Sequence, residues 1–401
     1  MPLDLHWFLP THGDGRDLAE PARGRGARPS RITRRPPDIG YLAQVARAAD
    51  RLGFASVLTP AGLFCEDPWV VASALAAQTE RLKFMIALRP GLASPTLVAQ
   101  MAASLQRVSA GRVLLNIVAG SDPDEQRRYG DWLDHDARYA RAEEFLTVLG
   151  GLWAGEPVDH SGEHYRVKAA LLARPPATAP AVFLGGSSPA AQRAAARHAD
   201  VYLAWGETPA QLGELLGRAR DQAAELGRTL RTGSRLHVIT RDTAREAWAE
   251  ADRLLAGVDQ ARIAAARQRF ARTDSEGQRR AAALHVDGNA RMEVYPNVWA
   301  GYSLIRPGAG AALVGSHEEV AERIAEYHAA GVDHLILSGQ PHLEEAYWFG
   351  EGVLPLLRHD GLLDPATDAQ TTTDAQTTTD AGVPTDAGAD SRRAPELAVG
   401  R

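Results

Sequence analysis

The chain has a single cysteine, no long hydrophobic run and no excess of positive charge. One cysteine, Cys65, excludes an internal disulfide framework and a cysteine-based zinc site. No apolar run approaches the roughly 20 residues that span a bilayer, and residues 1–15 lack the basic and apolar regions of a signal peptide. The net charge of −6 argues against nucleic-acid or anionic-membrane binding. We therefore expect a cytoplasmic protein with neither kind of partner.

Several cofactor motifs are missing as well. The chain has no G-x-x-x-x-G-K-S/T, no H-E-x-x-H, and no G-x-G-x-x-G between a predicted strand and helix. A nucleotide-binding P-loop, a zinc-protease site and a Rossmann-type nicotinamide site are therefore not indicated. The acidic stretch "GSDPDE" (120–125) lacks the spacing of an EF-hand calcium loop. We expect no bound metal.

What the chain does contain is a regular alternation of strand-like and helix-like segments. The strand-like segments are 4–10, 56–60, 83–90, 113–120, 181–186, 201–206, 235–241 and 334–339. Helical patterns fill most of the gaps, for example at 38–53, 95–112, 188–200 and 317–332. Eight such repeats in this length of chain favour a (β/α)₈ TIM barrel with insertions. A doubly wound open sheet is the competing fold.

Three segments do not fit the bare repeat. Residues 20–37 carry six arginines among Gly and Pro and indicate a loop. Residues 271–315 form a long insertion before the last repeat, and such insertions are more often lids than filler. Residues 365–401 are of low complexity and predict a disordered tail. The barrel domain is therefore expected to occupy residues 1–364.

The seventh strand segment carries two polar side chains on one face. Arg235 and His237 are two residues apart, so they point the same way. Burial of a guanidinium without an anionic partner is costly. Arg235 thus indicates either an anionic ligand or an internal ion pair, for example with Glu207.

A second candidate anion site is "GGSSPA" (185–190), where two glycines and two serines follow a strand and open a helix. Free N–H groups and the positive end of the helix dipole bind anions. Ordinary capping of the helix by serine explains the pattern equally well.

Taken in order along the chain, the motifs resemble the bacterial luciferase-like flavin-dependent monooxygenases, and within them the alkanesulfonate monooxygenase branch. The resemblance runs from residue 6 to about 347. The stretches that carry it are "HWFLPTHGDGR", "CEDPW", "RLKFMIALRP", "GSDPDE", "LDHDARY", "LGGSS", "AWGE", "RLHVI", "FARTDSEGQ", "PNVWAG", "RPGAGAALVG" and "SGQPHLEEAY".

The resemblance implies a luciferase-like barrel that uses reduced FMN and O₂ to cleave an alkanesulfonate into an aldehyde and sulfite. An NAD(P)H-dependent FMN reductase is implied as partner, and we expect a homo-oligomer. The implied catalytic residues are Cys65, Arg235, His237, Arg306 and His342. The implied flavin contacts are Asn116, Ala119, His135, Tyr139, Gly186, Ser187 and Ser188. The implied substrate contacts are Trp205, Arg235, His237, Arg306 and Gln340.

One departure from the family pattern concerns the substrate. The family has Tyr where this chain has Gln340. Gln donates a hydrogen bond but is not an acid near neutral pH, so a more polar sulfonate is predicted. Another organosulfur substrate, such as a sulfosugar or a sulfone, is one alternative. A flavin or deazaflavin (F420) oxidoreductase without desulfonation is the other.

Overall fold

Eight parallel strands close into a barrel in the computed structural model, which describes residues 1–18, 34–284, 292–306 and 308–364. The strands are β1 (Asp4–Phe8), β4 (Ser56–Thr59), β5 (Lys83–Leu88), β6 (Val113–Val118), β9 (Ala181–Gly185), β10 (Val201–Trp205), β11 (Arg231–Arg241) and β15 (His334–Ser338). Each pairs with the next in this order, and β15 pairs with β1. This closure confirms the barrel and excludes the open sheet.

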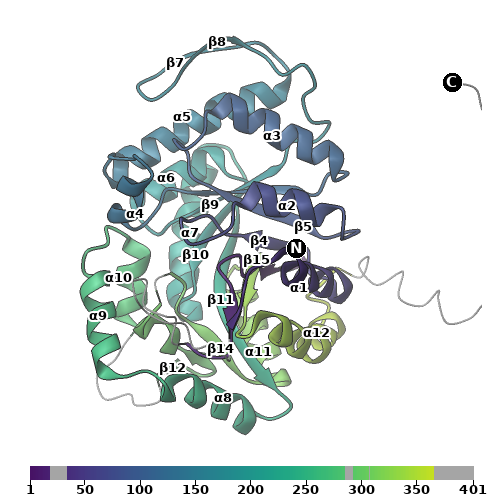
Figure 1. Ribbon diagram of the computed structural model, residues 1–401, viewed down its shortest axis with the longest axis vertical. Helices are drawn as coiled ribbons and strands as arrows, with labels where there is room; N and C mark the ends of the chain where they lie inside the picture. Colours follow the sequence, from purple (N-terminus) through teal and green to yellow (C-terminus); the bar gives the residue numbers. More distant parts are fainter. Residues whose placement is uncertain (19–33, 285–291, 307, 365–401) are drawn as a thin grey trace, which may run out of the picture. The chain divides into compact units, whose positions relative to one another are not determined.

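Helices follow the strands and cover the outside of the barrel (Figure 1). They are α1 (Ile39–Leu52), α2 (Pro68–Ala76), α3 (Pro95–Val108), α5 (His135–Ala154), α6 (Pro189–His198), α7 (Pro209–Glu225), α11 (His317–Ala329) and α12 (His342–His359). Their ends agree with local signals: Asp38 caps the start of α1, and Gly53 ends it in the left-handed conformation. The helical patterns at 38–53, 95–112, 188–200 and 317–332 are therefore confirmed.

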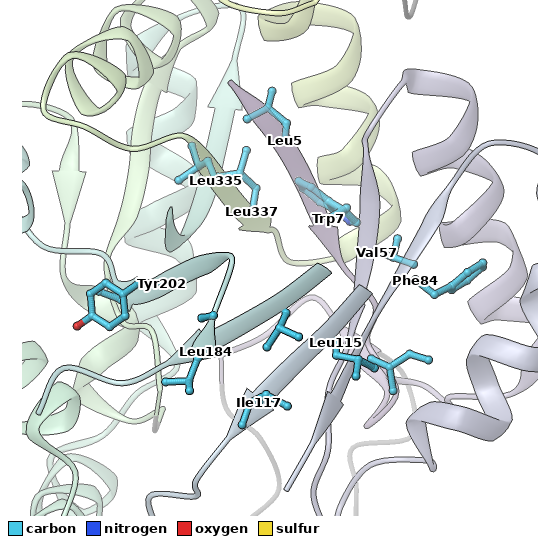
Figure 2. Packing of buried hydrophobic residues seen from close by; sticks show 14 of the residues in the cluster. Leu5, Trp7, Val57, Phe84, Leu115, Ile117, Leu184, Tyr202, Leu335 and Leu337 are labelled. Carbon is cyan, nitrogen blue, oxygen red and sulfur yellow. The ribbon is translucent and has the colours of Figure 1, made fainter. Parts of the chain in front are cut away.

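The core has two layers because strand side chains alternate between faces. Trp7 and Val57 point outward and pack against the helices, as do Leu335 and Leu337 (Figure 2). The side chains on the opposite face of the barrel strands point inward and fill the barrel. They are Phe8, Leu58, Met85, Ala87, Phe183, Val201, Leu203 and Ile336. The inner layer forms the floor beneath the cavity described below.

The irregular elements lie between the repeats. They are β2 (Asp14–Gly15), β3 (Arg34–Arg35), α4 (Pro123–Arg128), β7 (Val158–Ser161) and β8 (Arg166–Ala170). The strand β2 pairs with β3, so the chain on either side of residues 19–33 is held together. Most of the predicted arginine-rich loop and the whole predicted tail (365–401) lie outside the described residues.

The region between β11 and α11 contains α8 (Ala244–Ala256), α9 (Gln260–Phe270), α10 (Glu276–Ala283), β12 (Glu293–Tyr295), β13 (Val298–Trp299), the 3₁₀ turn η1 (Gly301–Leu304) and β14 (Ala312–Ser316). The predicted insertion at 271–315 thus has its own secondary structure. Its last strand, β14, pairs with the second half of β11 from His237 onward. This pairing joins the insertion directly to the barrel strand that carries Arg235 and His237.

Candidate active site

A cavity of about 300 Å³ opens at the carboxyl ends of the barrel strands. This is the end of a barrel where catalytic groups collect. Twelve of the fourteen residues that the sequence singled out line it: Cys65, Asn116, Ala119, His135, Tyr139, Gly186, Ser187, Ser188, Trp205, Arg235, His237 and Arg306. The fold therefore brings together side chains that are up to 241 positions apart in the chain.

Two arginines face this cavity without a carboxylate partner. Among the described residues, no acidic side chain forms an ion pair with Arg235, and its Nε has no hydrogen-bond partner. Its guanidinium carbon lies 4.2 Å from the centre of the Phe8 ring. Burial and the nearby charge of Arg306 lower the pKa of Arg235 to about 10, so it remains protonated at neutral pH. Within the described part of the chain, the Nε of Arg306 is likewise buried without a partner.

The ion pair that the sequence suggested between Arg235 and Glu207 does not form. Glu207 instead pairs with Arg280 of α10, with N–O distances of 2.5 and 2.6 Å. The reason is the direction of the side chains. Arg235 points into the barrel mouth, and Glu207 is turned toward the helix that lies over the rim. The predicted ion pair with Glu207 is therefore wrong, and the anionic ligand stays a prediction.

His237 is buried with both ring nitrogens engaged. Its Nε2 lies 3.1 Å from the carbonyl oxygen of Ala309, and its Nδ1 lies 2.8 Å from the hydroxyl of Ser338. A carbonyl only accepts, so Nε2 carries the proton and Nδ1 accepts from Ser338. Burial, reinforced by Arg235 and Arg306, lowers the pKa of His237 well below its ordinary value. His237 is therefore a neutral imidazole at physiological pH.

The "GGSS" stretch forms one end of the cavity at the start of α6. The hydroxyl of Ser188 accepts from the amide of Ala191, 3.2 Å away, so the capping interpretation holds for this residue. Gly186 has φ +144°, and a Cβ there would lie 2.2 Å from the Tyr139 hydroxyl. That hydroxyl donates to the carbonyl of Gly185. Glycine is thus required where the chain turns into the helix whose amino end faces the cavity.

The remaining predicted flavin contacts lie around the same wall. The amide oxygen of Asn116 is buried on β6 without a hydrogen-bond partner in the described chain. His135 contacts Asp136 at 2.6 Å, and its ring lies 5.1 Å from that of Tyr139. Asn116 therefore presents an unsatisfied acceptor to any group that enters the cavity.

Residues of the insertion complete the cavity. Ser275, Glu276 and Gly277, at the start of α10, are lining residues. A Cβ on Gly277 would lie 2.9 Å from the Trp205 ring, so α10 packs directly on Trp205. Asp274 also pairs with Arg138 of α5 at 2.8 Å. The start of α10 thus lies against the barrel rim, and its role as a lid stays a prediction.

Two predicted residues do not line the cavity. His342 is buried at the start of α12, where its backbone N–H and its Nδ1 contact the carboxylate of Asp14 at 2.7 and 3.0 Å. Gln340 is also buried, and its amide donates to the backbone carbonyl of Asp17. The prediction that Gln340 contacts the substrate therefore has no support from its position. Asp14 and Asp17 are far in sequence from His342 and Gln340, so the sequence could not predict these hydrogen bonds.

Several lining residues were not among the sequence candidates. Phe8 and Phe64 supply aromatic walls, and His12 lies at the rim. Burial and the charge of nearby His342 and arginines lower the pKa of His12 to about 3. Phe8 had a signal, since it alternates with the outward-facing Trp7. The start of α10 had only a coarse signal: it lies in the insertion at 271–315 and in the stretch "FARTDSEGQ", but the sequence did not single out its individual lining residues.

Some classes of site are absent from the described residues. They contain no group of three or more His, Cys, Asp or Glu side chains arranged to hold a metal ion. In the same residues, no helix is both long and apolar enough to cross a membrane. The cavity is lined by cationic, aromatic and hydrogen-bonding groups, together with the carboxylate of Glu276 and the thiol of Cys65.

These groups fit a flavin mononucleotide. Aromatic and aliphatic walls suit the flat ring system, and the unpartnered oxygen of Asn116 is suited to a ring N–H. Ser187 and Ser188 at the amino end of α6 suit the phosphate. The fold and the site together define a (β/α)₈ barrel with a cavity of about 300 Å³ at the carboxyl ends of its strands, lined by two arginines, aromatic rings and hydrogen-bonding groups.

Comparison with known proteins gives the family. Residues 3–334 match the luciferase-like monooxygenases, and the chain belongs to this family. Solved structures with the same fold include riboflavin lyase with a modified FMN and riboflavin (TM-score 0.73, 19% identity, 92% of this chain and 94% of that chain). The EDTA monooxygenase of Chelativorans sp. BNC1 has a TM-score of 0.72 and 21% identity, over 91% of this chain and 95% of that chain. A long-chain alkane monooxygenase has a TM-score of 0.72 and 19% identity, over 91% of this chain and 93% of that chain.

Proposed function

We propose that this protein is a monooxygenase that uses reduced FMN and O₂ to cleave the C–S bond of an alkanesulfonate. The overall reaction converts the sulfonate, O₂ and FMNH₂ into an aldehyde, sulfite, FMN and water. The observation that carries the proposal is Arg235, a protonated guanidinium in the cavity with no ion-pair partner among the described residues. A sulfonate stays ionised at all relevant pH values and offers oxygens that match an arginine fork.

The cavity residues divide into two groups under this proposal. Ser187, Ser188 and the amino end of α6 hold the flavin phosphate, and Asn116 accepts from the ring. Arg235 and Arg306 hold the sulfonate. When bound, the reduced flavin supplies the electrons that activate O₂.

The start of α10 closes the cavity from above and excludes water. Gly277 packs on Trp205, and the Arg280–Glu207 and Asp274–Arg138 ion pairs fasten the helix to the rim. Exclusion of water protects the reaction from side reactions. Because no dinucleotide-binding motif is present in the sequence, we propose that a separate NAD(P)H-dependent FMN reductase supplies the reduced flavin.

The test is a sulfite-release assay with FMN, NADH and an unrelated FMN reductase. A panel of octanesulfonate, a hydroxylated sulfonate, a sulfosugar and a dialkyl sulfone separates the substrate classes. We expect sulfite from at least one sulfonate, and none when either O₂ or the reductase is left out. Failure to release sulfite from every sulfonate, with turnover of the sulfone, would move the proposal to another organosulfur substrate.

A deazaflavin (F420) oxidoreductase is the alternative from a different class. It predicts hydride transfer that continues without O₂ and depends on F420 instead of FMN. Anaerobic titration of the protein with reduced FMN and with F420 distinguishes the two. Tighter binding of F420, with substrate conversion under nitrogen, would overturn the monooxygenase proposal.

A further inference from the structure

His237 faces the cavity, but its ring is fully occupied by the protein itself. Nε2 donates to Ala309 at 3.1 Å and Nδ1 accepts from Ser338 at 2.8 Å. The same residue's backbone amide donates to the carbonyl of Ala311 at 2.9 Å. To accept a proton from a substrate, the ring would first have to lose its bond from Ser338. The geometry therefore does not suit a general base.

The contacts of His237 lead instead to the segment that carries Arg306. Its ring stacks on Tyr302, with centroids 4.0 Å apart and planes at 17°. The amide of Arg306 donates to the carbonyl of Tyr302 at 2.9 Å, and its guanidinium carbon lies 5.6 Å from the centre of the Tyr302 ring. His237 thus contacts the segment on both sides of Arg306, at Tyr302 and at Ala309.

Helices α9 and α10 hold the same segment from the other side. The side-chain oxygen of Gln278, on α10, accepts from the amide of Gly308 at 3.1 Å. Arg269, at the end of α9, donates to the carbonyl of Ile305 at 3.1 Å. The segment that contains Arg306 therefore contacts barrel strand β11 on one side and helices α9 and α10 on the other. The position of Arg306 depends on both sets of contacts.

We propose that His237 is a positioning residue that fixes the described residues of the 302–309 segment (302–306 and 308–309) over the cavity and acts on the substrate anion through Arg306. The identity of that anion, a sulfonate, rests on the proposed function. The positioning itself does not, because every contact that supports it is within the protein. Arg306 is then an anion ligand that is available only when the lid segment is docked on His237.

Hydrogen–deuterium exchange of full-length protein tests the positioning without any substrate. His237→Ala removes the stacking and both hydrogen bonds, and we expect the amides of Arg306 and Gly308 to exchange about tenfold faster or more. His237→Gln keeps an N–H donor near the position of Nε2, so we expect it to recover part of the protection. Tyr302→Phe is the control, because the Tyr302 hydroxyl has no partner among the described residues. Unchanged exchange in His237→Ala overturns the proposal.

A double-mutant cycle tests whether His237 acts through Arg306. With octanesulfonate, we expect His237→Ala to raise KM by about three- to tenfold, the range for one lost hydrogen bond, and to change kcat little. In an Arg306→Ala background the same substitution is expected to add almost nothing. Additive effects, or a loss confined to kcat, would show direct catalysis by His237 and overturn the proposal. If octanesulfonate is not turned over, the cycle uses another sulfonate of the panel. If no sulfonate is a substrate, the proposed function fails, and the exchange experiment still decides the positioning.

Discussion

Arg280 of α10 and Glu207, two residues beyond the end of β10, form a two-pronged ion pair with N–O distances of 2.5 and 2.6 Å. The Glu207 side chain is only 6% exposed, so the pair joins the lid to the barrel at a largely desolvated point. It also occupies the carboxylate that the sequence suggested as an ion-pair partner of Arg235. As a result, Glu207 does not pair with Arg235.

Breaking this pair is predicted to loosen the lid. Arg280→Gln leaves the Glu207 carboxylate without its guanidinium, which disfavours the docked position of α10. We expect KM for the sulfonate to rise about three- to tenfold and the amides of α10 to exchange faster. Arg127→Gln is the matched control, since it removes a pair with Asp124 in which both side chains are more than half exposed. Equal behaviour of the two variants would mean that the Arg280–Glu207 pair does not hold the lid.

Arg235 is predicted to carry most of the affinity for the anion. A charge-assisted hydrogen bond contributes roughly 1.5–3 kcal/mol, so Arg235→Ala should lower kcat/KM about 10- to 150-fold. Arg235→Lys keeps the charge but loses the fork, and should recover only part of the activity. Arg231→Ala is the control, because this arginine is at the opposite end of the same strand and pairs with Asp4. Near-normal sulfite release by Arg235→Ala would remove Arg235 from the site.

Gly186 is predicted to be essential for flavin binding. Alanine there would adopt φ +144° and place a Cβ 2.2 Å from the Tyr139 hydroxyl, so the turn into α6 must shift. Strain of this kind costs of order 1–3 kcal/mol, and we expect a fall of about fivefold or more in affinity for reduced FMN by anaerobic titration. In the control Gly217→Ala, the new Cβ in α7 meets nothing within 4 Å. Flavin affinity that survives Gly186→Ala would place the phosphate elsewhere.

The amino-terminal end of the barrel is predicted to make the protein sensitive to acid. His6 and His334 are buried there with 3.1 Å between their facing nitrogens, and burial lowers their pKa values to about 4 and about 2. In the unfolded chain the pKa of histidine is about 6.5. Between that pH and the lowered pKa values of the folded state, the unfolded chain therefore binds more protons than the folded protein. Stability is fully present above pH 6.5 and falls as the pH drops toward 4, by about 2 kcal/mol for each histidine at pH 5.

Urea unfolding at pH 7.5 and pH 5 measures this effect. A His6→Asn/His334→Asn double variant should show a smaller loss of stability between the two pH values, even if it is less stable at both. The same loss in the variant and in the natural protein would assign the acid sensitivity to other groups.

Apolar runs and helix signals in the sequence were sufficient to predict all eight barrel strands, with both ends within two residues of those observed for seven of them. The exception in length is β11, which starts at Arg231 and not at Arg235. Its first residues, "RTGS", are polar or small and do not read as a strand. They become one because Val201–Trp205 of β10 pairs with Arg231–Arg235 across the barrel. Alternation along β11 also correctly placed Arg235 and His237 on one face, since that depends only on strand geometry.

What the sequence could not decide is which partner each polar side chain takes. The two partners of His237 are 72 and 101 positions away, and that of the Gln340 amide is 323 positions away. From the sequence, several arginines were plausible ion-pair partners for Glu207. Arg280 is the partner because α10 packs against the end of the barrel that carries Glu207. Local sequence determines strands, helices and the faces of their side chains, because these depend on backbone geometry and neighbouring residues. Closure of the barrel and docking of the lid decide which groups remain unpaired in the cavity, and hence what it can bind.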